Sequence, residues 1–314
     1  MVVMALHLVP RSILYFEHVA QLGSIQAASR KIGISASAIH RQIVAIEEAV
    51  GEPLFEREAN GMTLTPTGYL MLELARDWRI DSARLWSTIQ EARGVEQGTI
   101  RIAAMDGMVN GLVPELVHAL AGRFPKIQPE IEITSPDAAV KGLINGEFDL
   151  AVVVNVAEQE KLKVHWSQDF PLGCICTKDH PLAQRSGPKL AEIILHPIVF
   201  QSSALAIRKL LELRHSWIFE RPSASVVVNS IQLMKQLVVS GSHVAITSEL
   251  DAAPEIETGA LMFLPIKNQD LFEQKFSVVS NAMIPENAAT TEVLSLTTDI
   301  MIRRYGSPGS GTAE

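Results

Sequence analysis

From Thr99 onward the chain alternates between strand-like and helix-like segments, and this alternation restricts the fold more than any other feature. "TIRIAAM", "PEIEITS" and "FDLAVVV" read as strands, and the amphipathic stretches "GLVPELVHALAGRF" and "DAAVKGLINGE" between them read as helices. The alternation resumes with "HPIVFQ", "SASVVV" and "HVAIT", separated by helical patterns at 203–220 and 230–239. Such alternation predicts βαβ units and a mostly parallel sheet. We therefore expect two α/β lobes in sequence, followed by a final helix over about 287–304.

Residues 67–97 read as one long helix, because neither Gly nor Pro interrupts the chain between Tyr69 and Arg93. Its apolar residues form a narrow stripe at helical spacing that one aspartate breaks, at Leu70, Leu74, Trp78, Asp81, Leu85 and Ile89. On an isolated helix this stripe would remain in water, so it suits a partner helix. The alternative is a helix that packs on its own domain.

Two short helical patterns precede the long helix, and a glycine separates them. Ser24 can cap the first helix, and Gly33 suits the left-handed conformation that ends it. Ser35 can cap the second helix, whose buried face is formed by Ile39, Ile43, Ile46 and Val50. Two helices joined by a short turn that contains glycine form the helix-turn-helix pattern, here over 23–42.

The charge of residues 23–42 distinguishes a helix pair that binds DNA from a helix pair that only faces solvent. The whole chain has a net charge of −8, which argues against general binding to nucleic acid or membrane surfaces. Residues 23–42, in contrast, contain three basic side chains and no acidic one. Such local segregation is typical of phosphate contact. The residues predicted to meet DNA in this segment are Ser24, Arg30, Lys31, Ser35, Ala36, Ser37, His40, Arg41 and Gln42.

The segment "YFEHVAQLGSIQAASRKIGISASAIHRQIVAIEEAVGEPLFERE", with "MTLTPTGYLML" after it, resembles the winged helix-turn-helix of LysR-type transcriptional regulators. The matching landmarks are Gly23-Ser24, Ala27-Ala28, Ser35, Ala38, Arg41-Gln42-Ile43, Glu47, Gly51, Leu54-Phe55-Glu56-Arg57 and Leu64-Thr65-Pro66-Thr67-Gly68. The resemblance implies that Arg57 and Thr65 belong to a wing beside the phosphate backbone. It also implies a homodimer through the long helix, assembly into a homotetramer, and contact with RNA polymerase.

Two positions of the second helix depart from the family pattern. The family often has Gln where this chain has Ala36, and Ser or Thr where it has His40. Ala36 can only touch a thymine methyl group, whereas Arg41 can hold guanine through two hydrogen bonds. His40 either contacts a base or a phosphate, or faces solvent without a role.

The rest of the chain, to about residue 304, is similar to the effector domain of the same family, which has the two-lobed type II periplasmic-binding-protein fold. We place lobe I at about 98–168 and 270–304, and lobe II at about 169–269. Ligands of α/β sheets bind at the carboxyl ends of strands, against helix N-termini. The predicted contacts of a small-molecule effector are Met105, Asp106, Gly107, Met108, Thr134, Ser135, Gln201, Ser202, Ser203, Asn229 and Ser230.

Asp106 stands where many family members have a hydroxyl residue that suits carboxylate effectors. We expect an effector that is not a simple dianion, because Asp106 would repel it. In the alternative, Asp106 caps the helix that follows it and faces away from the cleft. Ser202, Ser203 and Ser230 are either hydroxyl donors to the effector or ordinary helix caps.

Other classes of function lack support in the sequence. No catalytic or phosphate-binding motif occurs, so we expect neither an enzyme nor a cofactor. Cys174 and Cys176 read as buried apolar residues on one face of a strand, with a redox or soft-metal site as the alternative. Without a basic leader or a long apolar run, we expect a cytoplasmic protein and no membrane partner.

The sequence therefore predicts a DNA-binding transcription regulator that a small-molecule effector controls. Its parts are a winged helix-turn-helix domain at 1–66, a dimerisation helix at 67–97, a two-lobed α/β effector domain at 98–304 and a disordered tail at 305–314. The alternative is a small-molecule-binding module of the solute-binding-protein type whose DNA-binding half is inactive.

Overall fold

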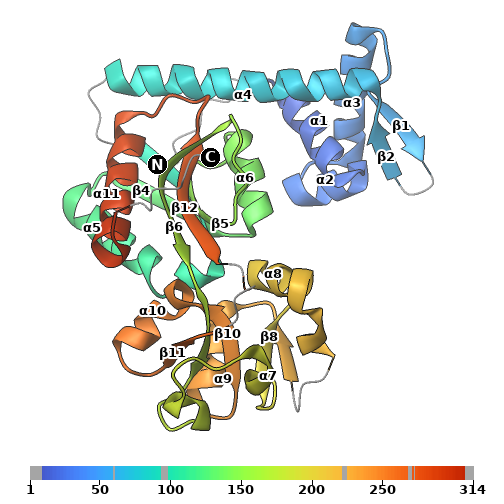
Figure 1. The fold of residues 1–314 in the computed structure, drawn as a ribbon. Coiled ribbons are helices and arrows are strands. Elements are labelled where there is room, and N and C mark those ends of the chain that lie inside the picture. The colour runs from blue at the N-terminus through green and yellow to red at the C-terminus, as the bar shows by residue number, and fades with distance from the viewer. Residues whose placement is uncertain are drawn as a thin grey trace. The chain divides into compact units, whose positions relative to one another are not determined.

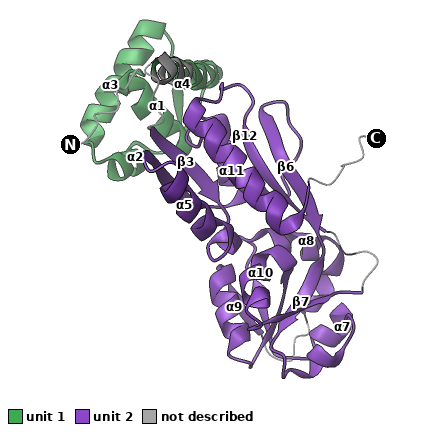
Figure 2. Ribbon diagram, turned by 90° about the vertical axis from the view of Figure 1, so that its left-hand side faces the viewer, with its two compact units in different colours: residues 1–92 green, residues 93–314 purple. Residues whose placement is uncertain are grey.

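The computed structural model describes residues 9–58, 61–92, 98–220, 225–267, 271 and 273–307. The chain divides into two compact units, Met1–Ala92 and Arg93–Glu314, and Figure 2 distinguishes them by colour. Each unit has its own hydrophobic core and is described separately. None of the described helices is both long enough and apolar enough to cross a membrane.

The N-terminal unit begins with a helical core and a short hairpin (Figure 1). Its elements are α1 (Arg11–Leu22), α2 (Ile25–Ile32), α3 (Ala36–Val50), β1 (Phe55–Glu58) and β2 (Gly61–Leu64). The predicted caps are confirmed: Ser24 accepts a hydrogen bond from Ala27 N, and Ser35 accepts one from Ala38 N. Gly33 ends α2 in the left-handed conformation. The helices meet in a core of Phe16, Val19, Ala28, Ile39, Ile43, Leu54 and Phe55.

The long helix α4 (Pro66–Ala92) starts directly after the hairpin, where a threonine fixes its first turn. The Thr65 hydroxyl donates to the Pro53 carbonyl at 2.7 Å and accepts from Gly68 N at 2.9 Å. Gly68 is buried, and a Cβ added to it would lie 2.1 Å from the Leu54 carbonyl oxygen. Residues of the "LTPTG" motif therefore bring the start of α4 into close contact with the backbone of Pro53 and Leu54, just before β1. Residues 93–97 of the predicted helix lie outside the described residues.

We expect Gly68→Ala to destabilise the N-terminal unit by about 1–3 kcal/mol, because the added methyl group would force the backbone of Leu54 aside. Gly122→Ala is the matched control, since nothing lies within 4 Å of a Cβ at that helical position. Alanine there should leave stability unchanged or raise it by up to about 1 kcal/mol. Urea unfolding of both variants measures the difference, and equal stabilities would disprove the close contact.

One face of α4 packs on its own unit and the neighbouring face does not. Ala75 is fully buried against the α1 side, and Arg79 lies 2.7 Å from the buried carboxylate of Glu17. Apolar residues of the predicted stripe remain exposed, with Leu70 at 68%, Leu74 at 40%, Trp78 at 38% and Leu85 at 51%. The helix thus packs on its own domain through another face, and these four stripe residues take little part in that packing.

Lobe I of the second unit is built on a five-stranded sheet in the order β4-β3-β5-β12-β6. The strands are β3 (Gly98–Ala104), β4 (Ile127–Ile133), β5 (Leu150–Val154), β6 (Leu162–Phe170) and β12 (Gln274–Asn281). In Figure 1, α5 (Leu112–Arg123) and α11 (Ala288–Tyr305) lie on one side of this sheet and α6 (Pro136–Ile144) on the other. Tyr305, which the sequence assigned to a disordered tail, ends α11 and packs edge-on against Phe170. Residues 308–314 of that tail lie outside the described residues.

Lobe II carries a second five-stranded sheet in the order β11-β7-β10-β8-β9. Its strands are β7 (Leu172–Cys176), β8 (Ile198–Gln201), β9 (Ser225–Val228), β10 (Val244–Ser248) and β11 (Met262–Pro265). One face packs against α7 (Leu190–Ile193) and α8 (Ala206–His215). The other face packs against α9 (Ile231–Val239) and α10 (Glu249–Glu257). Short 3-10 helices at 106–108, 181–184 and 216–219 complete the unit, and the first of them is η1.

The expectation of mostly parallel sheets is confirmed, with one reversed strand in each sheet. In lobe I, β4, β3 and β5 pair parallel, and β6 runs the same way because β5 and β6 are both antiparallel to β12. In lobe II, β10, β8, β9 and β11 share one direction, and β7 is antiparallel to its neighbours β10 and β11. The reversed strands β7 and β12 are those on which the chain enters each lobe from the other.

Cys174 and Cys176 lie on β7 and are both fully buried. Both pack against α7 and α8, whereas Ile175 between them faces the opposite core, so the prediction of one shared face is confirmed. Burial raises the pKa of both thiols, that of Cys176 to about 11, so both stay protonated at neutral pH. They therefore act as small apolar core residues in this structure.

Candidate functional sites: a nucleic-acid interface and an inter-lobe pocket

The outer face of α3 is polar and cation-bearing in its first turns, and the acidic residues of the helix, Glu47 and Glu48, lie towards its other end. Ile39 and Ile43 point into the core of the unit, which turns the opposite side of the helix to solvent. Ser35, Ser37, His40, Arg41 and Gln42 are exposed there, and Ala36 is half-buried beside them. These predicted contacts thus share the first turns of one helix, the part that reaches base edges in helix-turn-helix proteins.

Further cations stand near this face and remain available for phosphate. Arg30 and Lys31 lie exposed in the last turn of α2, and Arg57 lies exposed in the wing strand β1. Within the described residues, neither these three nor Arg41 forms an ion pair. In contrast, the Glu47 carboxylate is held inward by Leu54 N at 2.8 Å. The basic charge of the segment is therefore not neutralised by an ion pair within the described part of the unit.

Thr65 must be removed from the predicted DNA contacts. Its side chain is buried, and its hydroxyl is used as both donor and acceptor at the start of α4. A phosphate oxygen therefore has no access to it. Ser24 is half-buried and caps α2, so its role in the structure is at least partly local. The sequence similarity marked Thr65 as part of the family motif. It did not show that the Thr65 hydroxyl bonds to Pro53 and Gly68 within the unit.

A pocket of about 250 Å³ lies between the two lobes of the second unit. It brings together predicted residues that are far apart in the sequence: Met105, Asp106, Gly107, Thr134, Ser135, Gln201 and Asn229. These residues follow strands of both sheets, in agreement with the rule that ligands bind at the carboxyl ends of strands. The volume is at the small end of ligand pockets, which span roughly 300–1,000 Å³.

Four predicted residues do not line this pocket. Met108 is 1% exposed and belongs to the core of lobe I. Ser202 and Ser203 lie outside the lining, and Ser202 accepts a local hydrogen bond from Ala204 N. Ser230 caps α9 by accepting from Leu233 N, as the alternative for it stated.

Two polar residues of the pocket were not found from the sequence. Gln274 enters on β12, the strand that returns from lobe II, so no local motif places this strand beside β5. Asp251 belongs to α10, a helix that contains Pro254 and therefore lacks an ordinary helical sequence pattern. The remaining additions form the apolar walls: Ile133, Pro136, Val154, Ala204, Leu205, Ala206, Ile207 and Ile231.

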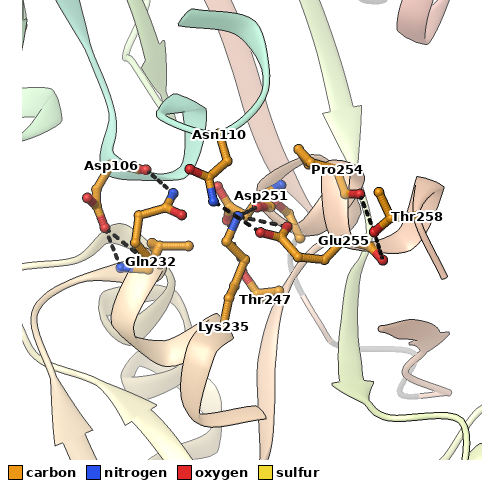
Figure 3. A network of polar contacts seen from close by, with 11 residues as sticks. Asp106, Asn110, Gln232, Lys235, Thr247, Asp251, Pro254, Glu255 and Thr258 are labelled. Carbon is orange, nitrogen blue, oxygen red and sulfur yellow. Dashed lines mark hydrogen bonds and ion pairs between the residues drawn. The ribbon is translucent and has the colours of Figure 1, made fainter. Parts of the chain in front are cut away.

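Asp106 connects the lobes in a way that neither sequence interpretation foresaw (Figure 3). Its Oδ2 accepts hydrogen bonds from Ser230 Oγ at 3.0 Å, from Gln232 N at 3.2 Å and from Ile231 N. Gln232 Nε2 in turn donates to the Asp106 carbonyl oxygen at 2.7 Å. The carboxylate of lobe I therefore caps α9 of lobe II, and the alternative in which it caps the helix that follows it is wrong.

A second contact between the lobes lies beside the first in Figure 3. Asn110 Nδ2 donates to Glu255 Oε1 at 3.2 Å, and Glu255 also pairs with the fully buried Lys235 at 2.9 Å. Lys235 donates to the Asp251 carbonyl oxygen at 3.0 Å. Burial raises the pKa of the Asp251 carboxyl, and hydroxyl donors at Thr247 and Ser248 partly offset this effect. Together these bonds tie η1 and its following loop to α9 and α10.

Two protein-family models match this chain, one in each unit. The family described as "Bacterial regulatory helix-turn-helix protein, lysR family" matches residues 10–69, and the "LysR substrate binding domain" matches residues 93–299. The chain belongs to the LysR family. It is accordingly a DNA-binding transcription regulator with an effector domain, and the fold expected from the sequence is confirmed.

Relatives and solved structures cover most of this LysR-family chain. A "Probable RuBisCO transcriptional regulator" of Emiliania huxleyi is 27% identical over 252 residues, 78% of this chain and 80% of that one. A "RuBisCO operon transcriptional regulator" of Allochromatium vinosum is 24% identical over 83% of this chain and 86% of its own. A full-length OxyR variant from Pseudomonas aeruginosa has the same fold, with a TM-score of 0.62, 15% identity and 93% coverage of both chains. Full-length CbnR, solved with its target DNA, gives a TM-score of 0.53 at 21% identity, over 93% of this chain and 98% of that one.

Proposed function

We propose that this LysR-family regulator reads promoter DNA with the outer face of α3, and that a small molecule in the inter-lobe pocket controls it. The exposed, unpaired cations around that face support the first part most directly. The CbnR structure that contains target DNA supports the same placement by analogy of fold. The small molecule would act by changing the relative stability of two lobe arrangements, and only to the extent that it binds one of them better.

The proposed contacts fall into two groups. Arg30, Lys31 and Arg57 hold phosphates and set the position of the protein on the duplex. Ser35, Ser37, His40, Arg41 and Gln42 face the bases, and Ala36 contacts a thymine methyl group if it contacts a base at all. Specificity should depend on the second group, whereas the salt dependence of binding should follow the first.

We expect Arg41→Ala to weaken binding to a specific operator by about tenfold to a hundredfold, the loss typical of an arginine that holds guanine. Fluorescence anisotropy at fixed salt measures this change. Arg123→Ala is the control, since Arg123 is exposed at the end of α5 in the other unit. The circular dichroism spectrum and the oligomer size should stay unchanged in both variants. Full operator affinity in Arg41→Ala would remove Arg41 from the groove face.

The assembly follows from the same proposal. The exposed stripe on α4 would pair with its copy in a second protomer, giving a homodimer with two recognition helices. Further association to a homotetramer, contact with RNA polymerase and a cytoplasmic location belong to the proposal as well. So does the absence of catalysis, since the pocket is assigned to binding alone.

One observation favours a second candidate function. Ala36 offers no hydrogen bond where many relatives carry a glutamine, so the direct reading of bases through this position is lost. In this second candidate the α/β domain binds its ligand while the N-terminal unit no longer selects a DNA sequence. Equal affinity for operator and random DNA would favour it over the first proposal.

A further inference from the structure

We infer that the inter-lobe pocket accepts a small uncharged or cationic molecule rich in hydrogen-bond donors, and that it rejects carboxylates and phosphates. This inference rests on the proposed effector role of the pocket and names the chemistry of its ligand. The position that an anion would take at α9 is already filled by the protein. In addition, two lining residues present acceptors that lack donors.

The N-terminus of α9 is the natural anion site of the pocket, because its backbone N–H groups and the helix dipole favour negative charge. Asp106 occupies this place, with one carboxylate oxygen bonded to Ser230 Oγ and to the N–H groups of Ile231 and Gln232. The protein thus supplies its own carboxylate where a ligand carboxylate would otherwise bind. An anionic ligand would have to displace Asp106, and with it a contact that joins the lobes.

Two amide side chains in the lining are nearly fully buried and incompletely bonded. Gln201 is 4% exposed and Gln274 is 3% exposed, and no donor among the described residues reaches Oε1 of either. The orientation of the Gln201 amide is fixed, because its Nε2 donates to the Ile246 carbonyl oxygen at 3.3 Å. A buried acceptor without a donor is unfavourable, so a ligand that supplies N–H or O–H groups gains from both positions. A carboxylate or phosphate group, which only accepts, gains from neither.

The charges around the pocket also favour an uncharged or cationic ligand. Among the described lining residues the ionisable side chains are Asp106 and Asp251, and none is Lys or Arg. Three cations on the adjoining helices are engaged elsewhere, and one of them is Lys235 of α9, which pairs with Glu255. Lys209 lies 3.4 Å from Asp137, and Arg208 pairs with Glu212 while it stacks on Phe219. The N-terminus of α8 has no side-chain cap and lines the pocket, so it can bind one acceptor group of the ligand, but no cation among the described lining residues would balance a full negative charge there.

The test uses three probes of the same shape: benzamidinium, benzamide and benzoate. They differ in charge and in donors, and each is small enough for a pocket of about 250 Å³. Isothermal titration of the full-length protein without DNA gives their affinities at constant ionic strength. We expect benzamidinium to bind at least about tenfold more tightly than benzoate, with benzamide between them.

Substitutions in the protein show whether the probes bind in the inter-lobe pocket. Gln274→Met keeps the length of the side chain and removes its acceptor, and it should weaken benzamidinium about tenfold. Gln168→Met is the matched control, because Gln168 Oε1 also lacks a donor but lies outside the pocket lining. Asp106→Ala should gain benzoate binding by about tenfold, since it frees the N–H groups of α9. If the alanine variant does not fold, Asp106→Asn replaces it; this isosteric variant removes only the negative charge, so its gain in benzoate binding should be smaller.

The inference is overturned if benzoate binds the unaltered protein as tightly as benzamidinium, or if none of the three probes binds. It is also overturned if benzamidinium binding is insensitive to Gln274→Met, because the cation would then sit elsewhere. Since these titrations contain no DNA, a failure of operator recognition would not affect them. Conversely, a preference for benzoate would leave the regulator intact and assign it an anionic effector.

Discussion

Replacing Leu70 and Leu74 together by aspartate is expected to convert the dimer into monomers and to weaken operator binding by about a hundredfold or more. Both side chains are exposed on α4, at 68% and 40%, and they belong to the stripe that we assign to the partner helix. Four carboxylates would meet in the paired helices, where each would be removed from water without a cation. Loss of the dimer also removes the gain from binding two half-sites at once, which reaches roughly 10²–10⁴-fold.

Sedimentation velocity measures the oligomeric state, and gel shift at fixed salt measures operator affinity. The matched control places the same two charges at Leu195 and Leu213, which are 72% and 71% exposed and lie in the other unit. The control should keep both the dimer and its DNA affinity. If the Leu70/Leu74 variant remains a dimer with full affinity, α4 is not the dimer interface and the exposed stripe needs another explanation.

Arg79→Met is expected to destabilise the N-terminal unit by about 3–5 kcal/mol, the largest effect on stability that we predict. Glu17 is 2% exposed, and its carboxylate lies 2.7 Å from the Arg79 guanidinium. Methionine preserves most of the aliphatic packing but leaves a buried carboxylate without this cation. Removal of one partner from a buried ion pair is much more costly than the pair itself is stabilising.

Arg185→Met serves as the comparison, because Arg185 and Glu192 are 3.9 Å apart and their side chains are 66% and 41% exposed. A solvated pair of this kind contributes about 0–1 kcal/mol. Guanidinium unfolding, followed by circular dichroism, gives both values. An Arg79→Met variant as stable as Arg185→Met would show that the Glu17 carboxylate is solvated or otherwise compensated in solution.

Local signals predicted the N-terminal unit well. Ser24, Gly33 and Ser35 act within one helical turn of their positions, so their capping roles are visible in the sequence and confirmed in the structure. The strand β1 was not predicted, because three of its four residues are charged and it is stabilised by pairing with β2. Thr65 shows the same limit, since its hydroxyl bonds to Pro53, twelve positions away.

The pocket was predictable only in part, for a related reason. Strand ends identified Met105, Thr134, Gln201 and Asn229, because each follows or ends a strand of an α/β unit. The bonds between lobes join residues far apart in the chain, as when Asp106 caps a helix more than a hundred positions later. Gln274 likewise reaches the pocket only because β12 inserts beside β5 in the sheet of lobe I. Such long-range pairings depend on the folded chain.

The most direct test of the account is footprinting on the DNA upstream of the gene for this protein, with binding titrated against salt. We predict specific protection of sites on one face of the duplex. If Arg30, Lys31 and Arg57 of two protomers each neutralise one phosphate, log K should fall with log salt with a slope of about −5. Absence of protection at low salt, for a folded dimer, would contradict the assignment of α3 to the DNA groove. The chain would then be a ligand-binding module whose N-terminal unit no longer selects DNA.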